Sequence, residues 1–243
     1  MLKNTSYGTD VTAGQKEKLH LGCGLNTPEG WINVDGSWNA WLAKHPNLKR
    51  LLKIIRLLPR SALEIPWKPN IRTHDVRRTL PFSNDSLSVV YASHLLEHLY
   101  LEEAKRLLGE CFRVLKPGGI LRTVVPDLKS LVEEYVSESH SGHSDRPNGE
   151  SSPADRLNKK LGFRKPEPPS GNLIYRIYSV WKDLHEHKWM YDAESLVGYF
   201  NAAGFREVRE MQCHQSRIAS IREVEEPERI LNGAGICIEG VKP

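Results

Sequence analysis

Short apolar runs alternate along the chain with segments in which apolar residues recur at helical spacing. Five apolar runs bounded by turn residues predict strands, at residues 18–23, 31–35, 71–76, 87–93 and 119–126. Three segments predict amphipathic helices, at residues 101–116, 127–136 and 192–204. The Pro and Gly residues at 117–119, after Lys116, predict the end of the first helix, and Gly204 predicts the end of the last. Two more apolar runs, residues 205–214 and 233–242, have no helical pattern between them, which predicts an antiparallel pair.

This alternation predicts an α/β fold, with a mostly parallel sheet, helices on both faces and the antiparallel pair at one end. Residues 16–243 form one predicted domain, and residues 1–15 form a flexible tail that lacks the apolar core of a signal peptide. Two segments interrupt the alternation. Residues 38–66 include a basic amphipathic helix, and residues 138–185 are rich in Ser, Gly, Pro and charge, as expected of a lid or substrate loop.

The composition excludes several classes of protein. A 243-residue chain with 39% hydrophobic residues can bury a sizeable core. A net charge of +4 is too small to indicate nucleic-acid binding, so no specific nucleic-acid partner is expected. The four cysteines show no CxxC spacing, and no run of 18 apolar residues occurs. We therefore expect a cytoplasmic protein with reduced thiols.

A glycine turn follows the first predicted strand in the stretch KLHLGCGLNTPEGWINVD. Gly22 and Gly24 are present, but Thr27 stands where a dinucleotide-binding fold has its third glycine, so NAD is disfavoured. Asp35 ends the second strand, where its carboxylate can accept hydrogen bonds from two ribose hydroxyls. Asp75 ends the third strand, where it can meet an adenine amino group. The alternative to a nucleotide-binding turn is a tight turn with no binding role in an unrelated α/β protein.

Five motifs in order carry a family resemblance, namely LHLGCG, INVD, HDVRRTLPFSNDSLSVVYASHLLEHL, CFRVLKPGGILRTVVPDL and HKWMYDAESLVGYFNAAGF. Together they resemble the class I S-adenosylmethionine-dependent methyltransferases, and most of all the methyltransferase-11-like group associated with polysaccharide and cell-envelope biosynthesis. The resemblance implies a Rossmann-like, seven-stranded, mostly parallel sheet with its last strand antiparallel. It also implies S-adenosyl-L-methionine as the cofactor.

The resemblance assigns cofactor contacts residue by residue. It implies Gly22 and Gly24 at the methionine part and Asp35 at the ribose. It implies Asp75 and Val76 at the adenine, with Ser93 and His94 at the floor of the site.

Two departures from the family pattern stand out. His20 replaces the acid that the family has two residues before the first glycine, so we expect it to contact the cofactor in a different way. Only residues 23–30 separate the turn from the second strand, which predicts a short turn in place of a crossover helix.

Several histidines are candidates for chemistry. HLLEH at residues 94–98 matches a zinc-protease pattern in which His94 and His98 would ligate and Glu97 would act as base. The methyltransferase order explains the stretch without a metal, so none is expected. A core histidine whose ring bonds a backbone group is the simpler interpretation of His98. His94 is better placed, at the carboxyl end of a strand.

Methyl transfer to an alcohol benefits from a general base, and histidine is the usual one. The catalytic hypothesis ranks His187 first, as base or acceptor-orienting residue, His94 second and Asp127 third. Asp127 is equally explained as a helix N-cap. His187 is equally explained as part of a core-packed approach to the next helix.

The segment NLKRLLKIIRLLPR, residues 47–60, has an apolar face opposite a basic stripe. A surface helix over the sheet or the cofactor cleft is one interpretation. Weak peripheral contact with an anionic membrane or a lipid-linked substrate is another, and a phosphate-bearing substrate such as RNA also fits the stripe.

The family resemblance, and not the residues themselves, implies O-methylation of a sugar, glycan or related small-molecule acceptor. A methyltransferase acting on RNA or protein, or a non-catalytic nucleotide-binding partner protein, would share most of these motifs.

Overall fold

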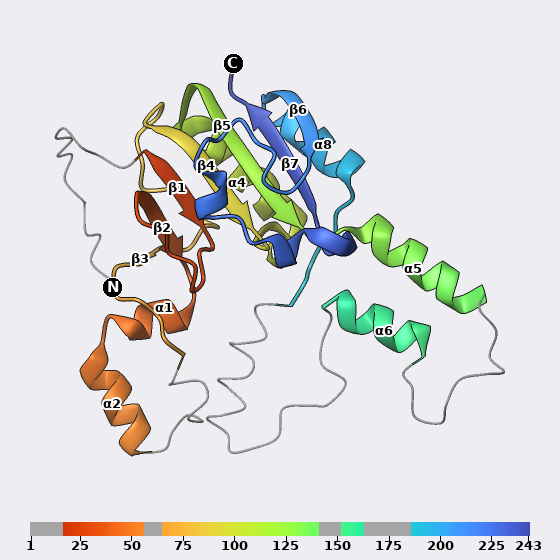
Figure 1. Cartoon of the computed structure of the whole chain (residues 1–243). Coiled ribbons are helices and arrows are strands. Elements are labelled where there is room, and N and C mark those ends of the chain that lie inside the picture. Colours follow the sequence, from red (N-terminus) through yellow and green to blue (C-terminus); the bar gives the residue numbers. More distant parts are fainter. Residues whose placement is uncertain (1–16, 56–64, 141–151, 163–185) are drawn as a thin grey trace.

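Seven strands form one mixed sheet in a computed structural model that describes residues 17–55, 65–140, 152–162 and 186–243 (Figure 1). The strand order is β3-β2-β1-β4-β5-β7-β6. The strands are β1 (Lys18–Leu21), β2 (Trp31–Asp35), β3 (Arg72–Thr73), β4 (Leu87–Ser93), β5 (Leu115–Val125), β6 (Arg206–Met211) and β7 (Ile236–Val241). Strand β7 is antiparallel to both of its neighbours, and the other pairings are parallel. The predicted fold class is confirmed.

Ten short and long helices connect these strands within the described ranges. The α-helices are α1 (Trp38–Ala43), α2 (Pro46–Ile54), α4 (Leu101–Val114), α5 (Leu128–His140), α6 (Pro153–Lys160) and α8 (Ala193–Ala202). The 3-10 helices are η1 (Leu96–His98), η4 (Ile221–Glu223), η5 (Pro227–Arg229) and η6 (Leu231–Gly233). A turn replaces the first crossover helix, as predicted. None of the described helices combines the length and apolar character needed to cross a bilayer.

The two faces of the sheet are covered differently, because successive side chains of a strand point to opposite faces. Leu19 and Leu21 of β1 join the core that α4 and α8 close. Trp31 and Tyr91 point to the other face and pack against apolar residues of the segment that carries η4 and η5. Three 3-10 helices thus lie between β6 and β7, where the sequence showed no helical pattern.

The junction of α4 and β5 differs from the expected boundaries. Helix α4 ends at Val114, and β5 begins at the next residue rather than after the glycines. Residues 116–119 form an irregularity within the strand, where the pairing with β4 shifts register. Gly118 has a φ of 77°, and its N–H donates to the Lys242 carbonyl at 2.8 Å. Pairing with the end of β7 therefore extends the strand through a sequence typical of a turn.

The segment at residues 38–66 is helical where the structure describes it. Leu52 of α2 packs against Leu42 of α1. Leu51, Ile54 and Ile55 are at least half exposed, so the predicted apolar face is only partly buried. The prediction for residues 56–60 lies outside the described residues.

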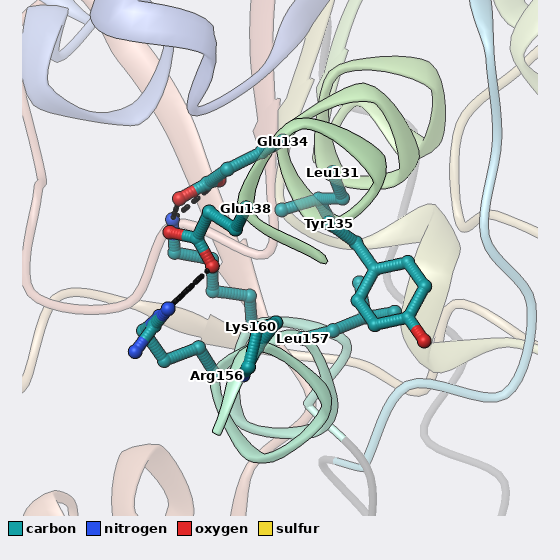
Figure 2. Close-up of a pocket in the computed structure, with 8 residues that line it drawn as sticks. Leu131, Glu134, Tyr135, Glu138, Arg156, Leu157 and Lys160 are labelled. Atoms are coloured by element: carbon teal, nitrogen blue, oxygen red, sulfur yellow. Dashed lines mark hydrogen bonds and ion pairs between the residues drawn. The ribbon is translucent and has the colours of Figure 1, made fainter. Parts of the chain in front are cut away.

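The second predicted insertion, residues 138–185, begins inside α5 and includes α6. Figure 2 shows the pocket between these two helices, which project from the sheet in Figure 1. Ion pairs join Arg156 to Glu138 at 2.7 Å and Lys160 to Glu134 at 2.6 Å. None of the predicted site residues lines the pocket, and its charged side chains form ion pairs with one another. The pocket is therefore a gap between two helices and not the candidate active site.

Arg122 of β5 anchors the segment between β6 and β7 to the sheet. The guanidinium is fully buried and bonds both carboxylate oxygens of Glu225, at 2.8 and 3.0 Å. It also reaches Glu239 at 3.3 Å and the carbonyl oxygens of Gln212 and Gln215. A buried charge with this many partners holds one geometry and is costly to disrupt.

Glu225→Gln should therefore destabilise the fold by about 3–5 kcal/mol, because it leaves the buried guanidinium short of one negative charge. Urea unfolding at neutral pH measures the effect. The matched control is Glu226→Gln at the next residue, whose partner Arg229 is exposed and whose loss should cost at most about 1 kcal/mol. Equal small losses in both variants would contradict the anchoring role.

Candidate active site

The ends of five parallel strands meet at one edge of the sheet, and most of the predicted site residues lie at or just beyond these ends. Contacts run along this edge from strand to strand. The His74 N–H donates to the Asp35 carbonyl at 3.2 Å, and the Cys23 N–H donates to the Val34 carbonyl at 3.1 Å. The His94 N–H donates to the Val124 carbonyl at 2.9 Å. Open α/β sheets bind ligands at this edge, where the connections leave in opposite directions.

The glycine turn after β1 depends on a conformation that suits glycine. Gly22 and Gly24 have φ values of 64° and 54°. A Cβ at Gly22 would lie 3.2 Å from Leu95, whereas a Cβ at Gly24 would meet no atom within 4 Å. The turn therefore packs closely against the residue after His94 and presents open space at its second glycine.

Asp35 holds the turn from the next strand. One carboxylate oxygen accepts the Gly24 N–H at 3.0 Å, and the other accepts the Ser37 N–H at 2.8 Å. The residue is buried, but each oxygen keeps acceptor capacity for a hydroxyl. Burial raises the pKa of the neighbouring Cys23 thiol to about 12, so this thiol stays protonated and is no nucleophile.

Asp75 lies beyond β3 and is bound by Arg77. The guanidinium forms a two-pronged pair with the carboxylate, with both distances at 2.8 Å. This hydrogen-bonded pair lowers the pKa of Asp75. Val76 is partly buried against the core and offers an apolar surface beside the carboxylate. No motif or spacing in the sequence points to Arg77, whose role follows only from the folded geometry.

These residues fit S-adenosylmethionine. An open glycine turn, a carboxylate with spare acceptor capacity and an apolar residue beside a second carboxylate are what its methionine, ribose and adenine parts require. Gly22, Gly24, Asp35, Asp75 and Val76 would hold it, and the bound cofactor would supply an electrophilic methyl group. Ser93 is buried at the end of β4, next to this region.

His20 lies on the opposite face of β1 from Leu19 and Leu21. Its ring packs among Trp31 and Tyr91, with centroid distances of 6.4 and 5.3 Å. Burial, followed by the positive charge of Arg229, lowers the pKa of His20 to about 3. The side chain is therefore neutral at physiological pH, and its contact with the cofactor stays a prediction.

A carboxylate and three imidazoles gather beyond β4. His94 has a φ of 49°, and its Nδ1 lies 3.2 Å from Glu97 Oε1. Its Nε2 lies 3.3 Å from the Arg229 carbonyl oxygen. The His98 and His187 rings meet edge to face at 5.0 Å, and His98 Nε2 lies 4.0 Å from Glu97. Because residues 96–98 form a 3-10 turn, His94 and His98 do not share the face of an α-helix.

The backbone after residue 185 fixes His187 in this group. The Lys188 N–H donates to the Glu97 carbonyl at 2.7 Å, and the His187 N–H donates to the Gly162 carbonyl at 3.2 Å. His98 Nδ1 lies 3.4 Å from the Glu186 carbonyl oxygen, a backbone contact of the kind expected for this ring. Two segments far apart in the sequence thus bring His98 and His187 together.

Asp127 follows β5, and its carboxylate accepts hydrogen bonds from the first residues of α5. Its carboxylate accepts the Lys129 N–H at 3.0 Å and the Ser130 hydroxyl at 2.6 Å. A backbone bridge also pairs Asp127 with Tyr191. These contacts favour the capping interpretation over a catalytic one.

Glu97, which the sequence suggested only as the base of a zinc-protease pattern, occupies the centre of this group. It is fully buried in the middle of the histidines, and neither oxygen has a hydrogen-bond donor among the described residues. Its spacing from His94 and His98 was visible, but its burial depends on the packing of residues 186–191 against it.

Comparisons with known proteins find one matching domain family and several distantly similar structures. Residues 49–123 match the model of a family described as a methyltransferase domain. No curated protein matches the chain. Similar solved structures include a SAM-dependent methyltransferase from Thermotoga maritima (17% identity, TM-score 0.45, covering 93% of this chain and 81% of that one). Another is a SAM-dependent methyltransferase from Archaeoglobus fulgidus (17% identity, TM-score 0.45, covering 94% of this chain and 87% of that one).

A third similar structure is a chain from the complex between the Haloferax volcanii Trm112 methyltransferase activator and a putative methyltransferase (15% identity, TM-score 0.44, covering 93% of this chain and 82% of that one). Similarities this distant assign neither an acceptor nor a partner.

Asp35→Ala should weaken binding of S-adenosylhomocysteine by about 1–3 kcal/mol, because it removes one side of a polar pair. Calorimetry on the unaltered chain should give micromolar affinity, about −8 kcal/mol. Asp155→Ala on α6, outside the predicted cofactor residues, should bind as the unaltered chain does. Binding of NAD in place of S-adenosylhomocysteine would overturn the assignment.

The family match spans β3, β4 and α4 and ends within β5, so it covers the centre of the sheet. A seven-stranded sheet in this order, with β7 reversed, is the fold of class I methyltransferases. The chain therefore has the fold of the class I S-adenosylmethionine-dependent methyltransferases, and its residues 49–123 match a methyltransferase domain.

Proposed function

We propose that the enzyme methylates a hydroxyl group of a sugar, a glycan or a related small molecule. The observation that supports this most directly is the pairing of His94 with the buried carboxylate of Glu97, 3.2 Å apart, at the carboxyl end of β4. A hydroxyl is a poor nucleophile and benefits from a base, whereas a carboxylate or phenolate acceptor needs little help. A histidine oriented by a buried acid is therefore suited to an alcohol.

In the proposed reaction the acceptor oxygen bonds to the methyl carbon while the sulfur–methyl bond breaks, and the hydroxyl proton passes to a histidine. The chain contributes by positioning the reactants and by taking that proton. His94 is the proton acceptor that the geometry favours. Glu97 Oε1 lies 3.2 Å from Nδ1 and the Arg229 carbonyl oxygen lies 3.3 Å from Nε2, so both would stabilise the positive charge of the imidazolium that forms.

His187 orients the acceptor in this proposal, the second of the two roles that the sequence suggested for it. Its ring is held by the backbone bond to Gly162 and by contact with His98. A Cβ on Gly162 would lie only 2.6 Å from His187 Nδ1, so that glycine leaves the room the ring occupies. Asp127 ranks third, since both of its carboxylate oxygens already accept hydrogen bonds.

The acceptor class is supported by resemblance to the methyltransferase-11-like group associated with polysaccharide and cell-envelope biosynthesis. The sequence lacks the N/D-P-P-Y/F signature of enzymes that methylate exocyclic amines of nucleic acids. Its net charge of +4 is also small for a protein that binds nucleic acid.

Weak contact with an anionic membrane is a further part of the proposal, because envelope acceptors are often linked to lipids. Leu51, Ile54 and Ile55 of the α2 region are 51%, 68% and 51% exposed. No acidic residue occurs between Asp35 and Glu64. An exposed apolar patch with basic residues around it suits an interface rich in anionic headgroups.

Radiolabelled methyl transfer to a panel of nucleotide sugars, oligosaccharides, tRNA and protein should show turnover in the sugar arms only. Base-stable label would then indicate an ether. Salt-sensitive transfer to RNA or protein would favour the alternative acceptors. Binding of S-adenosylhomocysteine with no transfer to any class would favour a non-catalytic partner protein.

His94→Gln should lower kcat about 10²–10⁴-fold and leave affinity for S-adenosylhomocysteine nearly unchanged, as expected for loss of a general base. His187→Ala should also lower turnover without loss of cofactor binding. His45→Gln, on an exposed ring next to α2, is the matched control and should keep normal kcat. Normal turnover in the His94 variant would exclude it as base.

The chain should sediment weakly with anionic vesicles at low salt and not at all at high salt, because one basic helix supplies a small, screened attraction. Lys53→Glu should weaken this binding, whereas Lys129→Glu on exposed α5 should not. Strong binding that survives high salt would show that apolar insertion of α2, rather than charge, anchors the chain.

A further inference from the structure

Within the described ranges, the carboxylate of Glu97 is buried without a group that compensates its negative charge. Its side chain is 0% exposed, and neither carboxylate oxygen has a hydrogen-bond donor among the described residues. A buried carboxylate is costly unless it is paired, hydrogen-bonded or bound to a cation. His94 lies 3.2 Å away, but its angle does not make a hydrogen bond.

Two further nitrogens point into the same space. His187 Nδ1 is buried and has no hydrogen-bond partner among the described residues. His98 Nε2 lies 4.0 Å from Glu97 Oε1. One donor atom from each of Glu97, His98 and His187 falls within 4.8 Å of the other two. We infer that Glu97, His98 and His187 bind a divalent metal ion, with zinc the best fit.

The contact of His98 with the backbone supports this assignment. Its Nδ1 faces the Glu186 carbonyl oxygen at 3.4 Å, so the ring proton belongs on Nδ1. The lone pair of Nε2 then faces the carboxylate of Glu97. Two electron-rich atoms facing each other are repelled unless a cation lies between them. Metal-binding histidines usually donate their other N–H to a backbone carbonyl or a carboxylate in this way.

Two histidines and one carboxylate are a ligand set of catalytic zinc sites, which leave the fourth position open. Bonds of about 2.0–2.2 Å place tetrahedral ligands about 3.3–3.6 Å apart, so the donor atoms, which lie within 4.8 Å of one another, would move closer when a metal binds. Imidazole nitrogen also favours zinc over magnesium or calcium.

Lys188, which follows His187 in the sequence, does not supply the missing cation. Its Nζ donates to the His98 carbonyl at 2.8 Å and lies 4.9 Å from the centroid of the Tyr100 ring. The ammonium is thus satisfied by other groups.

This site differs from the zinc-protease interpretation of HLLEH. Here Glu97 is a ligand rather than a base, and His187 replaces His94. The site does not depend on the identity of the acceptor, but it adds to the proposed function. His187 would orient a hydroxyl through the open metal position, where zinc makes a bound hydroxyl easier to deprotonate, and His94 would remain beside it to take the proton.

The test uses the full chain, stripped with a chelator and titrated with zinc in the absence of any acceptor. We expect one tight site per chain, and cobalt in place of zinc should give the visible absorption of a tetrahedral site. Glu97→Gln and His187→Gln should each weaken zinc binding more than about 100-fold, since loss even of an outer-shell partner costs 10–100-fold. His140→Gln, an exposed histidine on α5, should bind zinc normally.

The two variants also separate folding from binding. Glu97→Gln keeps the side-chain volume and removes the buried charge, so without a metal it should fold as well as the unaltered chain. If it fails to fold, His187→Gln alone decides the outcome. Absence of a zinc site in the unaltered chain, or equal zinc affinity in all variants, would overturn the inference. Methyl transfer is measured separately, so failure of the metal site leaves the proposed acceptor chemistry standing.

Discussion

The parallel pairing of β1 with both β2 and β4 is the constraint on which the site depends. Leu21 pairs with Val34 on one side and with Ala92 on the other. The next residues along each strand are therefore the glycine turn, Asp35 and the Ser93–His94 step. A slip of one residue would turn every side chain of β1 to the other face and separate Gly24 from Asp35. The hydrogen bond between these two residues is thus a product of sheet register, not of local sequence.

The sequence was informative where periodicity and chain order determine structure. The helix at 101–114, the seven strands and the short turn after β1 follow from patterns that tertiary packing did not override. The strand-end positions of Asp35 and His94 follow from the same patterns. The residues that could not be predicted depend on long-range packing. The irregular start of β5 requires Lys242, and the burial of Glu97 requires the chain after residue 185. His20 and Arg77 take their surroundings from neighbours that no spacing rule connects to them.

Two buried charges show how differently this fold treats ionised groups. Arg122 is surrounded by carboxylates and carbonyl oxygens that match its hydrogen-bond donors, so it holds the segment between β6 and β7 against one face of the sheet. Within the part of the chain that the structure describes, Glu97 has no comparable set of donors. Structural charges are satisfied by the chain itself, whereas a charge left open in the interior points to something that arrives from outside. The contrast is clear because both residues have no exposed surface.

The hydrogen bond from the His187 N–H to the Gly162 carbonyl joins the two ends of the intervening chain at 3.2 Å. A second backbone bond, from the Lys188 N–H to the Glu97 carbonyl, fixes the next residue to η1. The imidazole of His187 is thus carried by a backbone that is held on both sides of the residue by bonds that do not involve its side chain. A substitution at this position therefore removes the ring and leaves those backbone bonds in place.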